Sequence, residues 1–155
     1  MDLSDLLTKN AVIAGLKAKS KKQAIQEMSA KAAALTGLSE REVFDTLLQR
    51  ERLGSTGVGH GIAIPHGKLT RLDHLVGLFA RLEKPVDFDA LDDQPVDLVF
   101  LLLAPEGAGA DHLKALARIA RQLRDANVTQ GLRASHDPNE IYELLTQPIA
   151  SSNAA

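Results

Sequence analysis

The sequence predicts an α/β layered domain, because segments with strand character alternate with segments of helical periodicity. Apolar residues recur at helical spacing over 20–36 and again over 39–53. Residues 75–82 alternate in the manner of a strand, and residues 96–103 form the most apolar run in the chain. Helical spacing returns over 111–123. This order of elements favours helices packed on the faces of one sheet.

Size and composition limit the classes of function. At 155 residues the chain has the length of one domain, so we expect residues 1–155 to fold as a unit. The net charge of −2 and the lack of a basic block argue against a nucleic-acid partner. No apolar run has membrane-helix length, and the first residues lack the basic region of a secretion signal. With no cysteine present, these features predict a cytoplasmic protein that does not insert into membranes.

The first half of the chain carries clear start and stop signals. Residues 11–16 have the β-propensity of a strand. Ser20, followed three residues later by a glutamine, is a capping box that begins a helix, and Gly37 ends it. Ser39, followed three residues later by a glutamate, begins a second helix that ends near Gly54.

The second half is predicted in the same way. Residues 96–103 suit a central strand that is buried on both faces. A helix follows from Asp111, and a short helix is expected over 128–134. Asp137, with proline next and glutamate three residues on, begins a last helix. Residues 151–155 are expected to form a frayed tail. Aromatic residues are scarce, so the core must consist mainly of aliphatic side chains.

One stretch, residues 54–68, concentrates residues that can bind phosphate. It holds five of the eleven glycines, which let backbone amides approach an anion closely. Residues 62–64 are a brief apolar strand, and Pro65 stiffens the backbone ahead of His66. An imidazole with a cation, Lys68, two residues further on makes a phosphoryl site plausible. A plain irregular loop also accounts for the glycines, and the stretch fits neither the P-loop nor the dinucleotide pattern.

The motifs around this stretch identify a family resemblance. Arg-Glu-Arg-Leu-Gly-Ser-Thr over 50–56 and Gly-Ile-Ala-Ile-Pro-His-Gly-Lys over 61–68 resemble the signature of the IIA components of the bacterial phosphoenolpyruvate phosphotransferase system. The nitrogen-regulatory IIA proteins are the nearest branch, with fructose and mannitol IIA domains as relatives. Residues 88–98 and 111–113 agree, so the resemblance covers nearly the whole chain. It implies a mixed, roughly five-stranded sheet with helices on both faces.

The resemblance implies a phosphohistidine carrier and assigns its residues. His66 is the phosphorylated nucleophile, reacting through Nε2, while Arg50 and His112 bind the phosphoryl group; Ser55 and Lys68 are weaker candidates around them. The residue types by themselves also fit simpler roles. Arg50 falls in the last turn of a helix, where the dipole favours any cation, and His112 could be an exposed histidine without a role. Only the fold can bring His66 and His112 together across 46 residues.

No metal or cofactor is expected to take part. His60 and His74 lie six and eight residues from His66, spacings that match no helical pair of ligands. His60 stands where a small or amide residue is expected in the resembled family. It either adds a second titrating group near the phosphoryl group or is exposed and silent.

Three functions follow from these features. In the first, the chain takes a phosphoryl group on His66 from an HPr-like phosphocarrier protein and regulates nitrogen- or potassium-related targets, such as a potassium transporter or a sensor kinase. In the second, it passes the group to a IIB domain of a fructose- or mannitol-type uptake system. In the third, it regulates partners by binding alone. The first two make it an enzyme only in the sense of a phosphotransferase component, with no small-molecule turnover of its own.

Overall fold

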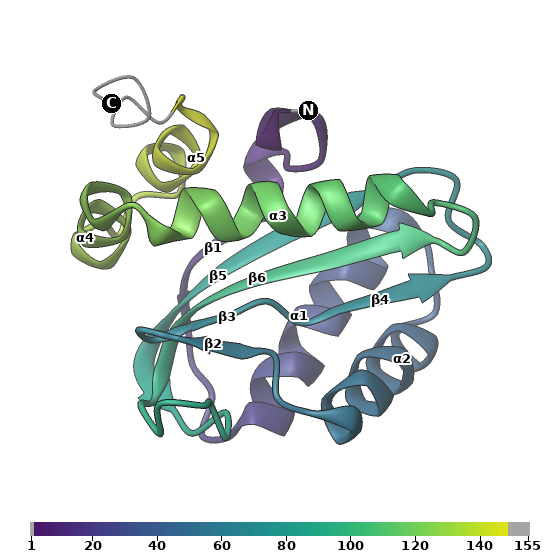
Figure 1. Cartoon of the computed structure of the whole chain (residues 1–155), viewed down its shortest axis with the longest axis horizontal. Helices are drawn as coiled ribbons and strands as arrows, with labels where there is room; N and C mark the ends of the chain where they lie inside the picture. The colour runs from purple at the N-terminus through teal and green to yellow at the C-terminus, as the bar shows by residue number, and fades with distance from the viewer. Residues whose placement is uncertain (1, 149–155) are drawn as a thin grey trace.

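A six-stranded mixed sheet with helices on both faces forms the domain in this computed structural model, which describes residues 2–148 (Figure 1). The strands are β1 (Val12–Leu16), β2 (Gly57–Gly59), β3 (Ile62–Ala63), β4 (His66–Leu69), β5 (Val76–Val86) and β6 (Val96–Pro105). The predicted α/β class and mixed sheet are confirmed. The strand count exceeds the expected five because the glycine-rich stretch contributes three short strands of its own.

Five helices cover the sheet. They are α1 (Lys21–Thr36), α2 (Glu40–Leu53), α3 (Ala110–Arg124), α4 (Ala126–Ala134) and α5 (Pro138–Thr146), with short 3-10 turns at Leu3–Asp5 and Lys9–Ala11. Helices α1 and α2 lie behind the sheet in Figure 1, and α3 runs across its front. No helix in the described part of the chain combines the length and apolar character needed to span a bilayer.

The predicted helix signals are confirmed. The Ser20 hydroxyl accepts a hydrogen bond from the Gln23 amide at 3.1 Å, and Gly37 ends α1 with a left-handed φ of 79°. Ser39 caps α2 in the same way. Helix α4 begins two residues earlier than predicted because the Asp125 side chain caps it. The tail predicted at 151–155 lies outside the described residues.

Strand β6 is the centre of the sheet, as the sequence predicts. It pairs with β5 antiparallel on one side and with β3 and β4 parallel on the other. The residues of β6 from Leu98 to Ala104 are completely buried. Three of the four phenylalanines, Phe79, Phe88 and Phe100, are also completely buried, so aromatic rings contribute more to the core than the composition suggested.

The glycine-rich stretch is an ordered hairpin, so the alternative of a plain irregular loop is wrong, and the brief strand predicted within 62–64 is confirmed as β3. Strands β2 and β3 pair antiparallel around a turn at His60 and Gly61, both of which have positive φ. The φ of 78° at Gly61 favours glycine, and a Cβ there would also lie 2.6 Å from the guanidinium of Arg133. The hairpin leads through Pro65, whose carbonyl accepts from the Leu102 amide, into β4.

Candidate active site

His66 is the first residue of β4 and is held on a rigid support. Its backbone is paired in parallel register with Leu102 of the central strand β6. The preceding residue, Pro65, fixes one backbone angle and also bonds to β6 through its carbonyl. His66 as a whole is partly exposed to solvent. The local fold therefore presents this imidazole from a strand with little freedom to move.

The tautomer of His66 follows from its hydrogen bond. Nδ1 lies 2.8 Å from the carbonyl oxygen of Ile64. A carbonyl can only accept a hydrogen bond, so Nδ1 must carry the proton. In the neutral ring this leaves the lone pair on Nε2. Nε2 is thus the nitrogen that can act as a nucleophile.

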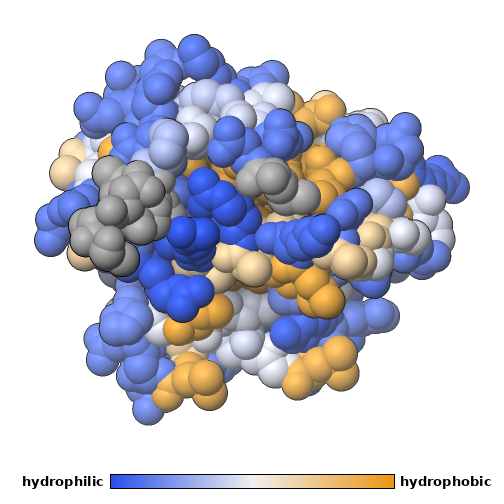
Figure 2. Space-filling model, turned by 45° about the horizontal axis from the view of Figure 1, so that its top comes forward, coloured by the Kyte–Doolittle hydropathy of each residue, from blue (hydrophilic) through white to orange (hydrophobic). Residues whose placement is uncertain are grey.

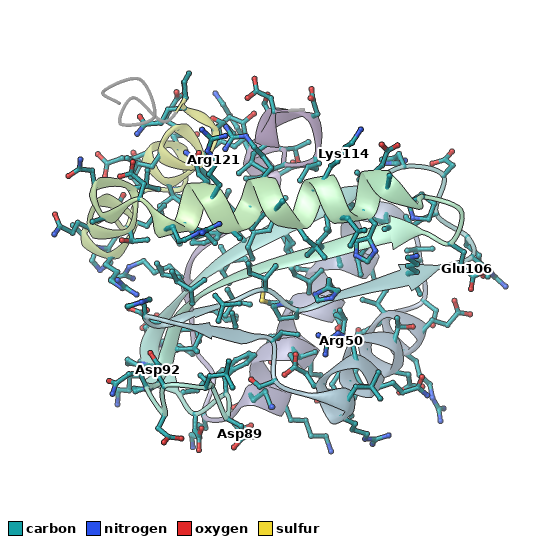
Figure 3. The ribbon with its side chains drawn as sticks, viewed as in Figure 1. Arg50, Asp89, Asp92, Glu106, Lys114 and Arg121 are labelled. Atoms are coloured by element: carbon teal, nitrogen blue, oxygen red, sulfur yellow. The ribbon has the colours of Figure 1, made fainter. Side chains whose placement is uncertain are left out.

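Arg50 reaches the same nitrogen from α2 and is labelled beside β4 in Figure 3. Its Nε–H donates to Nε2 of His66 at 3.3 Å, and its Nη1–H donates to the carbonyl of Gly54 at 2.9 Å. The location in the last turn of α2 agrees with a favourable helix-dipole interaction. The geometry adds that this guanidinium is directed at the lone pair of His66.

His112 completes the group from α3. Its ring centroid lies 5.5 Å from that of His66, with the two planes at 65°. The residue is only 8% exposed, so the alternative that it is an exposed histidine is wrong. Its Nε2 is the sole buried side-chain nitrogen or oxygen within residues 2–148 that has no hydrogen-bond partner. A buried polar atom without a partner is costly, and a bound ligand is one way to satisfy it.

Burial and nearby positive charge keep both rings neutral. Burial lowers the pKa of His66 below its usual value, the hydrogen bond to Ile64 opposes this, and the charge of Arg50 adds to the lowering. Burial, His66 and Lys68 lower the pKa of His112. Neutral imidazole is the nucleophilic form, so the lone pair on His66 is available at neutral pH.

The weaker candidates differ in placement. Lys68 is exposed on β4 two residues after His66, so the two side chains share one face of the strand. The Ser55 hydroxyl instead donates to the carbonyl of Phe88 and accepts from the Gly57 amide. Its hydrogen bonds hold two loops together, and none of them reaches the histidines.

His60 is separated from this group. It occupies the turn of the β2–β3 hairpin with φ 57°, and its side chain is exposed. Strands β3 and β4 pair one after the other with β6, and this turn lies before β3, whereas His66 begins β4. Ile62 and His66 are already four positions apart on β6, or about 13 Å. Of the two alternatives for His60, the structure therefore favours an exposed histidine without a role over a second titrating group beside the phosphoryl group.

Sequence patterns could not reveal every part of the site. The carbonyls of Gly54 and Ile64 orient Arg50 and His66, and backbone atoms leave no signature in residue type. Glu51 and Thr56 belong to the family motif, but no role was predicted for them. Both are buried, and they contact each other. Among residues 2–148, no three acidic, histidine or cysteine side chains gather as metal ligands would.

Comparisons with known proteins agree with the motifs. Residues 5–147 match the family model described as phosphoenolpyruvate-dependent sugar phosphotransferase system, EIIA 2. The chain is 62% identical over 152 residues to the nitrogen regulatory protein of Bradyrhizobium diazoefficiens, covering 98% of this chain and 99% of that one.

Two solved structures extend the comparison. The nitrogen regulatory protein IIA-Ntr from Neisseria meningitidis is similar with a TM-score of 0.88 and 35% identity, covering 93% of this chain and 99% of that one. The mannitol IIA enzyme of Escherichia coli, in its complex with phosphorylated mannitol IIB, is similar with a TM-score of 0.75 and 26% identity, over 90% and 98% of the two chains.

Proposed function

The chain belongs to the EIIA 2 family of the phosphoenolpyruvate-dependent sugar phosphotransferase system, and on that premise we propose that it is a phosphohistidine carrier of the nitrogen-regulatory branch. The observation that supports this proposal most directly is the arrangement of side chains around Nε2 of His66. This lone pair is directed at a guanidinium and lies beside a second, neutral imidazole whose own Nε2 has no partner. Such an arrangement suits a phosphoryl group bound to His66.

The transfer step uses the groups already in place. Nε2 of His66 attacks the phosphorus of a phosphohistidine on the donor protein. The new N–P bond forms as the N–P bond to the donor imidazole breaks. The donor ring, protonated on its other nitrogen, takes the electron pair and leaves as neutral imidazole, and its positive charge passes to the phosphorylated ring of His66. The proton on Nδ1 of His66 stays on the hydrogen bond to Ile64 throughout. No acid or base is needed, so catalysis consists of positioning and charge stabilisation.

Arg50 and His112 stabilise the transferring group. The guanidinium is permanently charged and its planar donors match phosphate oxygens. His112 lies in the first turn of α3, whose partial positive charge also favours an anion. A neutral His112 can donate one hydrogen bond to a phosphoryl oxygen without opposing charge on His66. Lys68 supplies further positive charge at this face.

We assign the donor as an HPr-like phosphocarrier protein and the readout as regulation of nitrogen- or potassium-related targets. The similarity to nitrogen regulatory proteins over 98% of the chain supports the regulatory branch. The second candidate is a IIA component that passes the group to a IIB domain, and the related mannitol enzyme in complex with phosphorylated IIB favours it. The cytoplasmic location stays a prediction from the sequence.

A phosphotransfer assay tests the proposal. Incubation with phosphoenolpyruvate, enzyme I and the phosphocarrier protein should add one phosphoryl group that is labile in acid and stable in base. His66→Ala should abolish labelling. Labelling that survives this substitution, or an acid-stable adduct on a hydroxyl such as that of Ser55 or Thr56, would refute the assignment. A chain that is never labelled would leave regulation by binding alone.

A further inference from the structure

Glu51 is a buried carboxylate that directly follows Arg50 in α2. Its side chain is 2% exposed. It accepts hydrogen bonds from the amide of Thr56 at 3.2 Å and from the Thr56 hydroxyl, and it pairs with Nζ of Lys21 at 3.2 Å. A buried charge needs partners of this kind. The carboxylate therefore ties the end of α2 firmly to Thr56.

This tie sets the position of Arg50. The backbone carbonyl of Glu51 accepts from the Gly54 amide at 3.1 Å, while its side chain holds Thr56 two residues further on. Glu51 thus closes the turn between α2 and β2 from two sides. The carbonyl of Gly54, inside this turn, is the group that anchors Nη1 of Arg50. Any change in the shape of the turn would move the guanidinium.

A second route runs from the same carboxylate to His66. The carbonyl of Thr56 accepts from the amide of Ile64 at 3.0 Å. The carbonyl of Ile64 in turn accepts from Nδ1 of His66 at 2.8 Å. Three consecutive links therefore connect the carboxylate of Glu51 to the ring nitrogen that fixes the tautomer of the nucleophile.

We propose that Glu51 is a positioning residue for phosphoryl transfer, which sets the guanidinium of Arg50 and the ring of His66 relative to each other. The inference rests on the proposed function, because it concerns the same reaction. Glu51 contacts neither the donor nor the phosphoryl group. It acts through Thr56, which is the branching point of the two routes. This gives a role to the glutamate and the threonine of the family motif.

The surroundings of Glu51 allow its charge to be removed without leaving another charged group unpaired. Lys21 also donates to the Phe88 carbonyl at 3.3 Å and pairs with Asp89 at 3.3 Å, near the Asp89 label in Figure 3. Glu51→Gln therefore removes the charge without leaving Lys21 unpaired. The amide has nearly the same size but offers only one acceptor oxygen where the carboxylate offers two. It cannot accept from the amide and the hydroxyl of Thr56 in the observed way.

The effect on His66 can be observed without any transfer reaction. The charged groups that act on His66 are Arg50, which lowers its pKa, and Glu51, which raises it. His112 stands beside it and has its own pKa lowered by burial, His66 and Lys68. In Glu51→Gln the pKa of His66 should fall further, and imidazole ¹⁵N signals should show a weaker preference for the Nδ1–H tautomer.

The experiment compares Glu51→Gln with Asp97→Asn. Asp97 forms a partly buried ion pair with Arg133 near the start of β6, away from Leu102 and His66, so its loss perturbs the fold at a remote place. Phosphorylation rate by the donor proteins and imidazole ¹⁵N spectra are measured for both, below their unfolding temperatures. We expect the rate to fall about tenfold to a hundredfold in Glu51→Gln, since small displacements of reacting groups have effects of that size. Asp97→Asn should keep the wild-type rate and spectrum.

Each result decides the matter. A wild-type rate and spectrum in Glu51→Gln would overturn the proposal. An equal slowing of both variants with unchanged His66 signals would also overturn it, since Glu51 would then serve the fold alone. If Glu51→Gln fails to fold, Thr56→Val, which removes only the hydroxyl donor, should still slow transfer and shift the His66 signals. If the wild-type chain is never phosphorylated, the proposed function fails while the ¹⁵N spectra still test the positioning.

Discussion

The Nε–H of Arg50 lies 3.3 Å from Nε2 of His66, so the arginine covers the lone pair that the proposed transfer requires. An incoming phosphoryl group has to take this place. Arg50 keeps a second hydrogen bond, from Nη1 to the Gly54 carbonyl, about which its Nε–H can turn toward a phosphoryl oxygen. We therefore propose that the same donor covers the nucleophile before transfer and offsets charge during it.

Arg50→Ala and His112→Ala should impair transfer while the fold remains intact. Each substitution removes one proposed partner of the phosphoryl oxygens. A hydrogen bond to a charged group contributes about 1.5–3 kcal/mol, which corresponds to roughly a tenfold to hundredfold loss of rate. Single-turnover labelling by the phosphorylated donor measures this loss.

Arg52→Ala is the matched control for Arg50→Ala. It removes the same kind of side chain from the same last turn of α2, but Arg52 is exposed. It should transfer at the wild-type rate. Rates within a factor of two of wild type for both Arg50→Ala and His112→Ala would show that the two side chains do not bind the phosphoryl group.

The pH dependence of phosphorylation should follow the lowered pKa of His66. Burial, the largest effect, disfavours the imidazolium, so the neutral nucleophile persists below the usual histidine range near 6.5. Acceptance of the phosphoryl group should be constant above about pH 6.5 and should fall only as the pH drops through the lower pKa of the folded protein. An NMR titration of the His66 ring, with a histidine peptide as reference, measures the midpoint. A midpoint at or above that of the peptide would contradict the prediction.

The sequence predicts the elements better than their arrangement. Ser20, Gly37 and Ser39 act locally, through capping and backbone conformation, and each is recognisable from its neighbours. The order of the strands depends on pairing between distant segments, such as His66 with Leu102, which leaves no local pattern. Without the family resemblance, the strand order could not have been predicted.

In the candidate site, too, local features can be predicted from the sequence whereas contacts between distant segments cannot. His66 is identifiable because a rigid proline precedes it and glycines surround it. Nothing near His112 in the sequence indicates that α3 will bury it against His66, because that contact depends on β6 carrying the chain from one to the other. Glycines are uncommon in strands, so the glycine-rich stretch favours a loop on pattern alone. Here the β2–β3 hairpin requires positive φ at Gly59 and Gly61.

Gly67 sets the distance between α2 and β4, and an alanine there should disturb the site. A Cβ on Gly67 would lie 2.6 Å from Cγ2 of Thr46, and Thr46 is one turn before Arg50 on α2. In Gly67→Ala the methyl group of Thr46 must shift, and we expect α2 to move away from β4 and to separate Arg50 from His66. We expect a loss of about 1–3 kcal/mol in unfolding free energy, as for other overpacked positions, together with slower transfer.

Gly107→Ala is the matched control for Gly67→Ala. A Cβ at Gly107 meets no atom within 4 Å, so this variant should keep wild-type stability and transfer. Urea unfolding and the labelling assay measure the two properties. Equal stability of the two variants would show that α2 and β4 adapt to the methyl group at no cost.

We expect exposed apolar side chains at the end of α2 and the start of α3 to form a surface on which a regulatory target docks. Ile62 and Ile64 are buried, whereas Leu53 at the end of α2 and Leu113, which follows His112 in α3, are 85% and 68% exposed. Figure 2 shows that orange hydrophobic groups lie between blue hydrophilic ones on the face it presents. We expect a target to dock over His66 through these apolar side chains, which requires it to desolvate the ring.

Phosphorylation should then weaken target binding through charge. The phosphoryl group adds about −1.5 to −2 charges. Arg50 and Lys68 offset only part of this in a buried interface, and the remaining charge is costly to bury, whereas a neutral imidazole is not. His66→Glu should therefore lose affinity for a target such as a potassium transporter or a sensor kinase, while His66→Ala should retain it.

His136→Glu, which places the same charge at an exposed histidine beside Arg81, is the control and should bind like the wild type. Calorimetric titration of the target with the three variants measures these affinities. Equal affinity of His66→Glu and His66→Ala would mean that the target docks elsewhere and that phosphorylation does not signal through charge at the interface.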